Sequence, residues 1–237
     1  MYSGVFSIDL VGLLVLALAC FPYIFFKMRN LVPYPVKSTL KLTDYYILCT
    51  LLVYLVTGVY QQYFWTKKNK IKKEVKVPKI FLDNWISKNS DWVYVYNFVY
   101  YLIFGLVIIS VKNYKHFAVL MMGSIALMTG LSVIWYLLPN VVDTRIDTDN
   151  YYLKKVQAID TNTNNAAPSA HVVLSVYSYY ILRNVIGEIP ALCIPIIVST
   201  SCLKTSQHHC IDVVSGVIFT VAFYNLIFKR LSPSVFL

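Results

Sequence analysis

Long apolar runs alternate with short polar stretches along this chain. Runs of about 17–25 apolar residues are long enough to cross the hydrocarbon core of a bilayer as helices. The pattern predicts an all-α, polytopic membrane bundle of about seven transmembrane helices. An N-terminal helix and basic loop (1–43) precede one membrane domain (44–237), which contains a lysine-rich loop at 66–92. The predicted spans are residues 4–26, 45–65, 93–111, 117–138, 169–186, 191–203 and 209–228.

The composition supports a membrane location. Hydrophobic residues make up 58% of the chain and charged residues 14%, with a mean hydropathy of +0.60. Soluble domains contain roughly 25% charged residues, so the deficit argues against a soluble protein. The five cysteines form no C-x-x-C pair and imply neither a disulfide framework nor a zinc site.

The formal net charge is +10, and the stretch from Lys67 to Lys79 in the 66–92 loop contributes most of the excess, with seven lysines against Glu74 alone. In a membrane protein such a loop is expected to meet anionic lipid headgroups or an acidic substrate, and we expect no nucleic-acid partner. A solvated loop would give the same pattern. The stretch from Ile80 to Trp92 mixes aromatic and polar residues, which predicts an amphipathic piece lying at the membrane interface.

Alternation of the spans brings polar residues from distant parts of the chain together. The end of span 117–138, the start of span 169–186, and the turn that joins the last two spans all fall on one membrane face. Ionisable residues at such depths are costly and are candidate functional groups. The residues expected at this rim are Arg145, Ser169, His171, His208 and Asp212.

Each of these side chains has a chemical use at a helix end. Ser169 suits an N-cap, and the unpaired N–H groups that follow it form an anion site. His208 and Asp212 are four residues apart and share a helix face, so the carboxylate can hold the Nδ1 proton and leave Nε2 free. Arg145 can offer a bidentate guanidinium to a phosphate, and His171 stands in the first helical turn.

Two other interpretations of these residues stay open. His208 and Asp212 could form a satisfied buried pair without a catalytic role, or the histidines and Asp212 could bind zinc. However, the zinc motifs H-x-x-x-H and H-E-x-x-H are absent, and the adjacent His208 and His209 are expected to point apart. We therefore expect neither a metal nor another cofactor.

The same residues carry a resemblance to the type 2 phosphatidic acid phosphatase (lipid phosphate phosphatase) superfamily. Its motif P-S-G-H is similar to Pro168–His171, and its motif S-R-x5-H-x3-D is similar to Ser201–Asp212. Its first motif, K-x6-R-P, is represented only by Arg145, because Leu138 and Ile146 occupy the lysine and proline positions. The resemblance covers roughly residues 117–228, and it implies a six-span helical core with the first span as an addition.

The resemblance also implies a function, which is metal-independent phosphoryl transfer on a lipid phosphate. His208 would attack phosphorus and form a phosphohistidine, Asp212 would orient it, and His171 would protonate the leaving alkoxide. The phosphate-binding residues would be Arg145, Ser169, Ala170, Ser201 and Lys204.

The chain departs from the family at two cations, because Leu138 and Cys202 replace a lysine and an arginine. Three explanations compete. Lys204, Lys154 or Lys155 substitutes for the missing charge; the active site is degenerate; or the chain is similar to inositol phosphorylceramide and sphingomyelin synthases. The last explanation is favoured by residues 205–208, T-S-Q-H, which look similar to the T-K-Q-H of that branch.

The functions expected are therefore lipid phosphate hydrolysis or, alternatively, transfer of a phospho-headgroup to a lipid alcohol. A catalytically silent membrane binding protein and a transporter are alternatives of other classes. Lys and Arg counts place the site in the cytosol if the 66–92 loop is included and on the other side if it is not. Because the family usually faces away from the cytosol, we expect a non-cytosolic site. If the protein is eukaryotic, we expect it in the endoplasmic reticulum or another internal membrane. The oligomeric state stays open.

Overall fold

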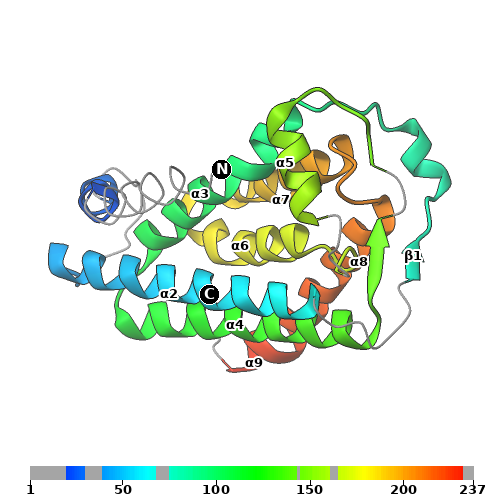
Figure 1. Cartoon of the computed structure of the whole chain (residues 1–237). Helices are drawn as coiled ribbons and strands as arrows, with labels where there is room; N and C mark the ends of the chain where they lie inside the picture. Colours follow the sequence, from blue (N-terminus) through cyan, green and yellow to red (C-terminus); the bar gives the residue numbers. More distant parts are fainter. Residues whose placement is uncertain (1–19, 30–38, 68–74, 143–144, 161–164, 232–237) are drawn as a thin grey trace.

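The computed structural model describes residues 20–29, 39–67, 75–142, 145–160 and 165–231 (Figure 1). Within these ranges the chain is helical apart from two strands of three residues each and the connecting turns. Residues 20–28 are helical, in agreement with the end of the first predicted span. The rest of that span, residues 4–19, and most of the Lys67–Lys79 run lie outside the described residues.

Long helices form the described bundle, and α6 lies at its centre, where it packs against α3, α4, α7 and α8 (Figure 1). A π-helical turn, η3 (Tyr224–Phe228), and the short α9 (Lys229–Leu231) continue the last long helix. The long helices are α2 (Leu42–Lys67), α3 (Trp92–Ser110), α4 (Tyr114–Leu137), α6 (Ala170–Ile186), α7 (Glu188–Lys204) and α8 (Cys210–Phe223).

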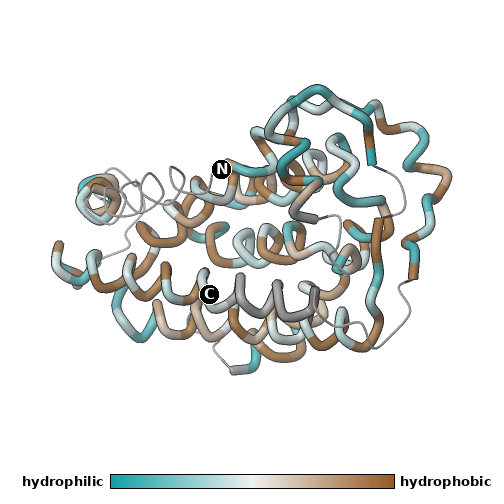
Figure 2. Tube along the Cα trace, in the orientation of Figure 1, coloured by the Kyte–Doolittle hydropathy of each residue, from teal (hydrophilic) through white to brown (hydrophobic). Residues whose placement is uncertain are grey.

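Apolar side chains fill the inside of the bundle and are also exposed at many positions on its outside. Figure 2 shows hydrophobic positions along the helices. Leu120, Leu127 and Trp135 of α4 face inward and are buried, and Tyr177 of α6 donates a hydrogen bond from its hydroxyl to the Leu120 carbonyl at 3.1 Å. A helix that is apolar on every side suits a lipid environment better than water. Outward-facing apolar residues include Tyr101, Leu102, Met122, Val133, Ile196 and Ile218.

Three helices of the described chain are long and apolar enough to cross a membrane, namely α3, α4 and the helix Cys210–Phe228. The helices α6 and α7 have 17 residues each, or about 25 Å at 1.5 Å per residue, against a hydrocarbon core of about 30 Å. In α2 the part with described side chains, Leu42–Gly58, is a shorter apolar helix. The structure thus confirms the all-helical class. By length and composition it contains three candidate spans among the described residues, and not the six or seven that the sequence predicted.

Two stretches that the sequence pattern leaves as loops contain regular structure. In the 66–92 loop, β1 (Val75–Val77) pairs in parallel with β2 (Asn140–Val142) and is followed by η2 (Phe81–Trp85). The stretch before α6 contains α5 (Tyr151–Asp160). Strands of three residues are too short to show an alternating pattern in the sequence, so their pairing could not be predicted.

The helix ends are arranged as the connectivity predicts. The end of α4, the start of α6, the end of α7 and the start of α8 gather at one end of the bundle, together with β2, α5 and the 75–91 segment (Figure 1). We call this the site end. At the opposite end, α6 turns into α7 at Gly187, which has a φ of +91°.

Candidate active site

The turn between α7 and α8, residues 205–209, presents His208. The Thr205 hydroxyl donates to the Ser201 carbonyl at 2.7 Å, and the Gln207 and His208 N–H groups both donate to the Cys202 carbonyl, at 3.2 and 3.3 Å. These bonds satisfy carbonyls that the end of α7 would otherwise leave unpaired. The reversal passes through Ser206 in the left-handed region (φ +52°). His208 is thereby held at the N-terminal edge of α8.

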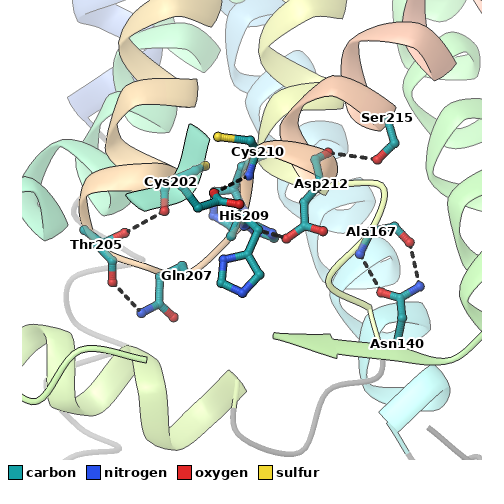
Figure 3. Close-up of polar contacts among 12 residues, drawn as sticks. Asn140, Ala167, Cys202, Thr205, Gln207, His209, Cys210, Asp212 and Ser215 are labelled. Atoms are coloured by element: carbon teal, nitrogen blue, oxygen red, sulfur yellow. Dashed lines mark hydrogen bonds and ion pairs between the residues drawn. The ribbon is translucent and has the colours of Figure 1, made fainter. Parts of the chain in front are cut away.

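Asp212 lies next to His208, as predicted. Its Oδ2 is 3.5 Å from His208 Nδ1. The same oxygen accepts a 2.8 Å hydrogen bond from the His209 N–H (Figure 3). The Asp212 side chain is fully buried. The carboxylate therefore faces Nδ1 of the ring, which leaves Nε2 as the nitrogen available for chemistry.

The second histidine of the rim, His171, lies beside the first. The ring centroids of His171 and His208 are 5.8 Å apart, across the contact between α6 and α8. Tyr96 of α3 stacks on His171 with centroids 4.1 Å apart, and its hydroxyl lies 3.2 Å from His171 Nδ1. Tyr96 was missed by the sequence analysis, because α3 contains several tyrosines and no pattern distinguishes this one.

Ser169 and Ala170 begin α6 beside Asp212. The Ser169 N–H donates to the Asp212 carbonyl at 3.1 Å, which joins the starts of α6 and α8. Ser169 occupies the N-cap position and is fully buried, but its hydroxyl makes no capping hydrogen bond, so that part of the expectation is wrong. Gly216 of α8 permits this close approach, since a Cβ there would lie 3.2 Å from the Ser169 carbonyl oxygen.

Asn140 holds the segment that leads into α6. Its Nδ2 donates to the carbonyls of Leu138 and Ala167, both at 2.8 Å, and its Oδ1 accepts from the Ala167 N–H at 2.6 Å (Figure 3). Its own carbonyl accepts from the Ala166 N–H at 3.1 Å. The Ala167–Pro168 peptide that follows is cis. Sequence analysis also missed Asn140, whose partners lie 27 residues away.

Arg145 reaches the α7–α8 turn, as predicted. Its Nη1 donates to the side-chain oxygen of Gln207, and Gln207 is buried and donates from Nε2 to the Thr205 carbonyl at 3.3 Å. The guanidinium therefore lies at the same turn as His208, carried there from the stretch between β2 and α5.

The other expected phosphate ligands have partners elsewhere. The Ser201 hydroxyl donates to the Val198 carbonyl of its own helix at 2.7 Å, and Lys204 Nζ donates to the Ser87 hydroxyl at 2.8 Å. Lys154 Nζ pairs with Asp149 at 3.2 Å, and Lys155 Nζ lies over the Tyr151 ring at 4.5 Å. Their proposed part in phosphate binding would require them to leave these partners.

The two family cation positions are also placed. Leu138 ends α4 with 64% of its surface exposed, whereas Cys202 is fully buried in α7. An apolar side chain and a thiol cannot supply the charge that a lysine and an arginine would give. Among the site residues predicted from the sequence, Arg145 is therefore the cation that contacts the turn.

Asp83 of η2 supports the start of α8 from outside. Its Oδ1 accepts from the Cys210 N–H at 2.8 Å and its Oδ2 accepts from the Ile80 N–H at 2.9 Å. Burial alone would raise the pKa of Asp83, but these two hydrogen bonds outweigh it and hold the pKa below its usual range. Burial lowers the pKa of the nearby Lys88 amine, against the opposing attraction of Asp83.

No group of three or more His, Cys, Asp or Glu side chains among the described residues is placed to hold a metal ion. The arrangement instead offers an oriented imidazole, a second imidazole with a tyrosine partner, a guanidinium and the start of a helix. In comparisons with known proteins, no protein-family model, curated protein or solved structure matches the chain.

Proposed function

We propose that this chain is a multi-pass membrane enzyme that transfers a phosphoryl group from a lipid phosphate through a phosphohistidine on His208. The observation that carries the proposal is the pair of neighbouring imidazoles, with centroids 5.8 Å apart, one of which has a buried carboxylate 3.5 Å from its Nδ1. A nucleophile oriented by a carboxylate, next to a second proton-transfer group, is the arrangement that covalent catalysis needs.

The first step would form the phosphohistidine. His208 Nε2 attacks phosphorus while Nδ1–H stays directed at Asp212, and the bond from phosphorus to the lipid oxygen breaks. His171, protonated on both ring nitrogens, gives its Nε2 proton to the departing alkoxide and keeps the proton on Nδ1. The Tyr96 hydroxyl oxygen, 3.2 Å from Nδ1, can accept that remaining N–H. Arg145 and the N–H groups at the start of α6 bind the phosphate oxygens.

The second step would release the group. Water attacks phosphorus, the bond to His208 Nε2 breaks, and His171 Nε2 takes the proton from water. Hydrolysis of a lipid phosphate such as phosphatidic acid results. A second candidate starts from a phosphodiester lipid, whose lipid alkoxide leaves in the first step while the headgroup stays on the phosphorus bound to His208. A lipid alcohol then attacks that phosphorus in place of water, gives its proton to His171 Nε2 and receives the phospho-headgroup. The loss of cations at Leu138 and Cys202 and the partners that hold Lys154 and Lys204 favour this candidate.

The same proposal requires α2, α6 and α7 to cross the membrane together with the three candidate spans, with the N-terminal helix as the seventh span. A short α6 is compatible with this, because it is surrounded by other helices and irregular backbone is tolerated at membrane depth where protein covers it. The site end would face away from the cytosol. Labelling a cysteine introduced at Asn162, in intact and permeabilised membranes, tests that side.

Phosphate release from phosphatidic acid by the detergent-purified protein, without divalent metal and in EDTA, tests the activity. His208→Ala should abolish release, and His116→Ala, at the start of α4 near the opposite end, should keep it. Activity that survives His208→Ala contradicts the mechanism, and loss in EDTA restored by zinc supports metal catalysis instead. No turnover of phosphatidic acid or of phospho-headgroup lipids by folded protein would favour a silent binding protein.

His171→Ala separates acid catalysis from a structural role. With a lipid alkoxide leaving group, loss of a general acid should cost about 10²–10⁴-fold in kcat. With p-nitrophenyl phosphate, whose leaving group needs no proton, the loss should be much smaller. An equal loss on both substrates would contradict the role of His171.

A further inference from the structure

The 75–91 segment carries a cluster of large apolar side chains on its outer side. Phe81, Leu82 and Trp85 are 65%, 50% and 72% exposed, and the rings of Phe81 and Trp85 meet edge to face with centroids 4.6 Å apart. Ile80 next to them is also exposed. We call these four residues the η2 apolar surface. An exposed cluster of this kind marks an interaction site in a folded protein.

The inner side of the same segment fixes the orientation of that surface. Asp83, which is 3% exposed, accepts the Cys210 N–H. Lys88 Nζ donates to the Leu203 carbonyl at 3.1 Å, and the Asn89 N–H donates to the Lys204 carbonyl at 2.9 Å. These bonds attach the segment to the end of α7 and the start of α8. The apolar residues of η2 therefore cannot turn inward without breaking buried polar contacts.

The position of the segment relative to the candidate spans indicates its partner. The helix α3, a candidate membrane span, begins at Trp92, seven residues after Trp85. The start of a span lies at the level of the lipid headgroups, and Trp is favoured there. Lys76 and Lys79, both exposed, precede the surface and add positive charge beside it. Apolar aromatic residues flanked by lysines are typical of segments that bind anionic membrane surfaces.

We propose that the η2 apolar surface inserts into the headgroup–acyl boundary of the leaflet that faces the site end, with the lipids of that leaflet as its partner. The inference rests on the proposed membrane location of the chain, but not on its catalytic activity. Its consequence is that the segment bound to the α7–α8 turn is seated in the same leaflet from which a lipid substrate would arrive.

Trp85 is a built-in probe of this insertion. The full-length protein is reconstituted into phosphatidylcholine–phosphatidylserine vesicles, with or without lipids brominated close to the headgroup. The emission difference between the wild type and Trp85→Phe isolates the contribution of Trp85. We expect brominated lipids to quench at least half of this difference signal and acrylamide in the water to quench little of it. Trp135→Phe is the matched control, because Trp135 is buried in the core and its signal should respond to neither quencher.

Three outcomes would overturn the inference. Trp85 could be quenched by acrylamide and not by brominated lipid, which means a water-exposed surface. It could be shielded from both at a high protein-to-lipid ratio and lose that shielding on dilution, which means that a second copy covers it. It could also be shielded from both at every ratio, which means burial within the chain. Resistance to carbonate extraction, measured separately, reports whether the protein is in the membrane at all, and phosphate release reports the proposed activity.

Discussion

The two ends of the bundle are built in different ways. At the site end, buried polar groups from distant parts of the chain bond to one another, as Asn140 does to Ala167 and Asp83 to Cys210. At the opposite end, α6 passes into α7 through the single residue Gly187. There Arg183 lies among tyrosines, with its guanidinium 5.5 Å from the Tyr180 ring centroid and Nη2 3.2 Å from the Tyr224 hydroxyl.

The comparison suggests why one end is the candidate site. Buried polar groups cost free energy unless each one is paired, and the opposite end shows that this fold can turn a helix without them. The site end nevertheless concentrates Asp212, His208 and Gln207, all buried. The proposed chemical function would explain this costly arrangement. Matched substitutions at the two ends test this explanation.

Substitution of one carboxylate at each end should give the largest difference between the two ends, and the quantity that differs is kcat. Asp212→Asn keeps the size of the side chain but no longer holds the Nδ1 proton of His208, so kcat should fall by about 10³–10⁴-fold, as when the aspartate of a catalytic triad is changed. Glu188→Gln at the opposite end replaces an exposed charged acceptor for the Tyr179 hydroxyl with a neutral amide oxygen and should leave kcat unchanged. Phosphate release under single-turnover conditions measures both. If both substitutions changed kcat only slightly and to the same extent, the assignment of the active site to the site end would be contradicted.

Substitutions at the turns should give the next largest difference between the two ends, because both destabilise the protein but only the one at the site end should also lower activity. Asn140→Ala removes three side-chain hydrogen bonds at the entry to α6, at about 0.5–1.5 kcal/mol each, so unfolding free energy should fall by about 2–4 kcal/mol. Because these bonds position Ser169 and His171, activity should fall as well. Gly187→Ala forces a positive φ on alanine and should cost about 1–3 kcal/mol with activity retained. Thermal unfolding and phosphate release measure the two effects, and normal activity in folded Asn140→Ala protein would contradict the positioning role.

The residues of the candidate site were easier to predict from the sequence than the residues that hold them in position. His208 and Asp212 lie together as predicted, but the predicted reason, a shared helix face, is wrong, because His208 stands in the turn before α8 and is held there by its bond to the Cys202 carbonyl. Arg145, Ser169 and His171 were predictable to the same end from alternation of the spans. Whether Ser201 and Lys204 bind phosphate stays a prediction, since each contacts another group in the structure.

Asn140, Tyr96 and Asp83 could not be predicted, for a physical reason. Their partners lie 27, 75 and 127 residues away, and nothing in a local pattern reports a contact of that range. The number of spans was hard to predict for a related reason. A helix of 17 residues, such as α6 or α7, is too short to identify as a span by length, and its neighbours in space decide whether it can cross.

Substitution of one arginine at each end should give a smaller difference, and the quantity that differs is KM. Arg145→Lys keeps the charge but loses the planar fork that can hold two phosphate oxygens, so KM should rise about 10-fold or more, as expected for a lost charge-assisted bond of about 1.5–3 kcal/mol. Arg183→Lys loses its stacking among the tyrosines and should lower only the unfolding temperature. Substrate titrations of both variants separate KM from kcat. A KM effect in Arg183→Lys, or none in Arg145→Lys, would reverse the assignment of the phosphate-binding end.

Substitution of Asp83 should give the smallest effect, which is a change in how the stability of the protein depends on pH. Its hydrogen bonds to the N–H groups of Cys210 and Ile80 hold its folded-state pKa below the ordinary value of 3.8. Between these two pKa values the unfolded chain binds more protons, so this contribution to stability is complete above the unfolded pKa and is lost as pH falls through the folded pKa. Asp83→Asn should flatten the acid side of the unfolding profile and expose the Cys210 amide to hydrogen exchange. An unchanged acid slope, with the amide still protected, would mean that the start of α8 does not depend on the 75–91 segment.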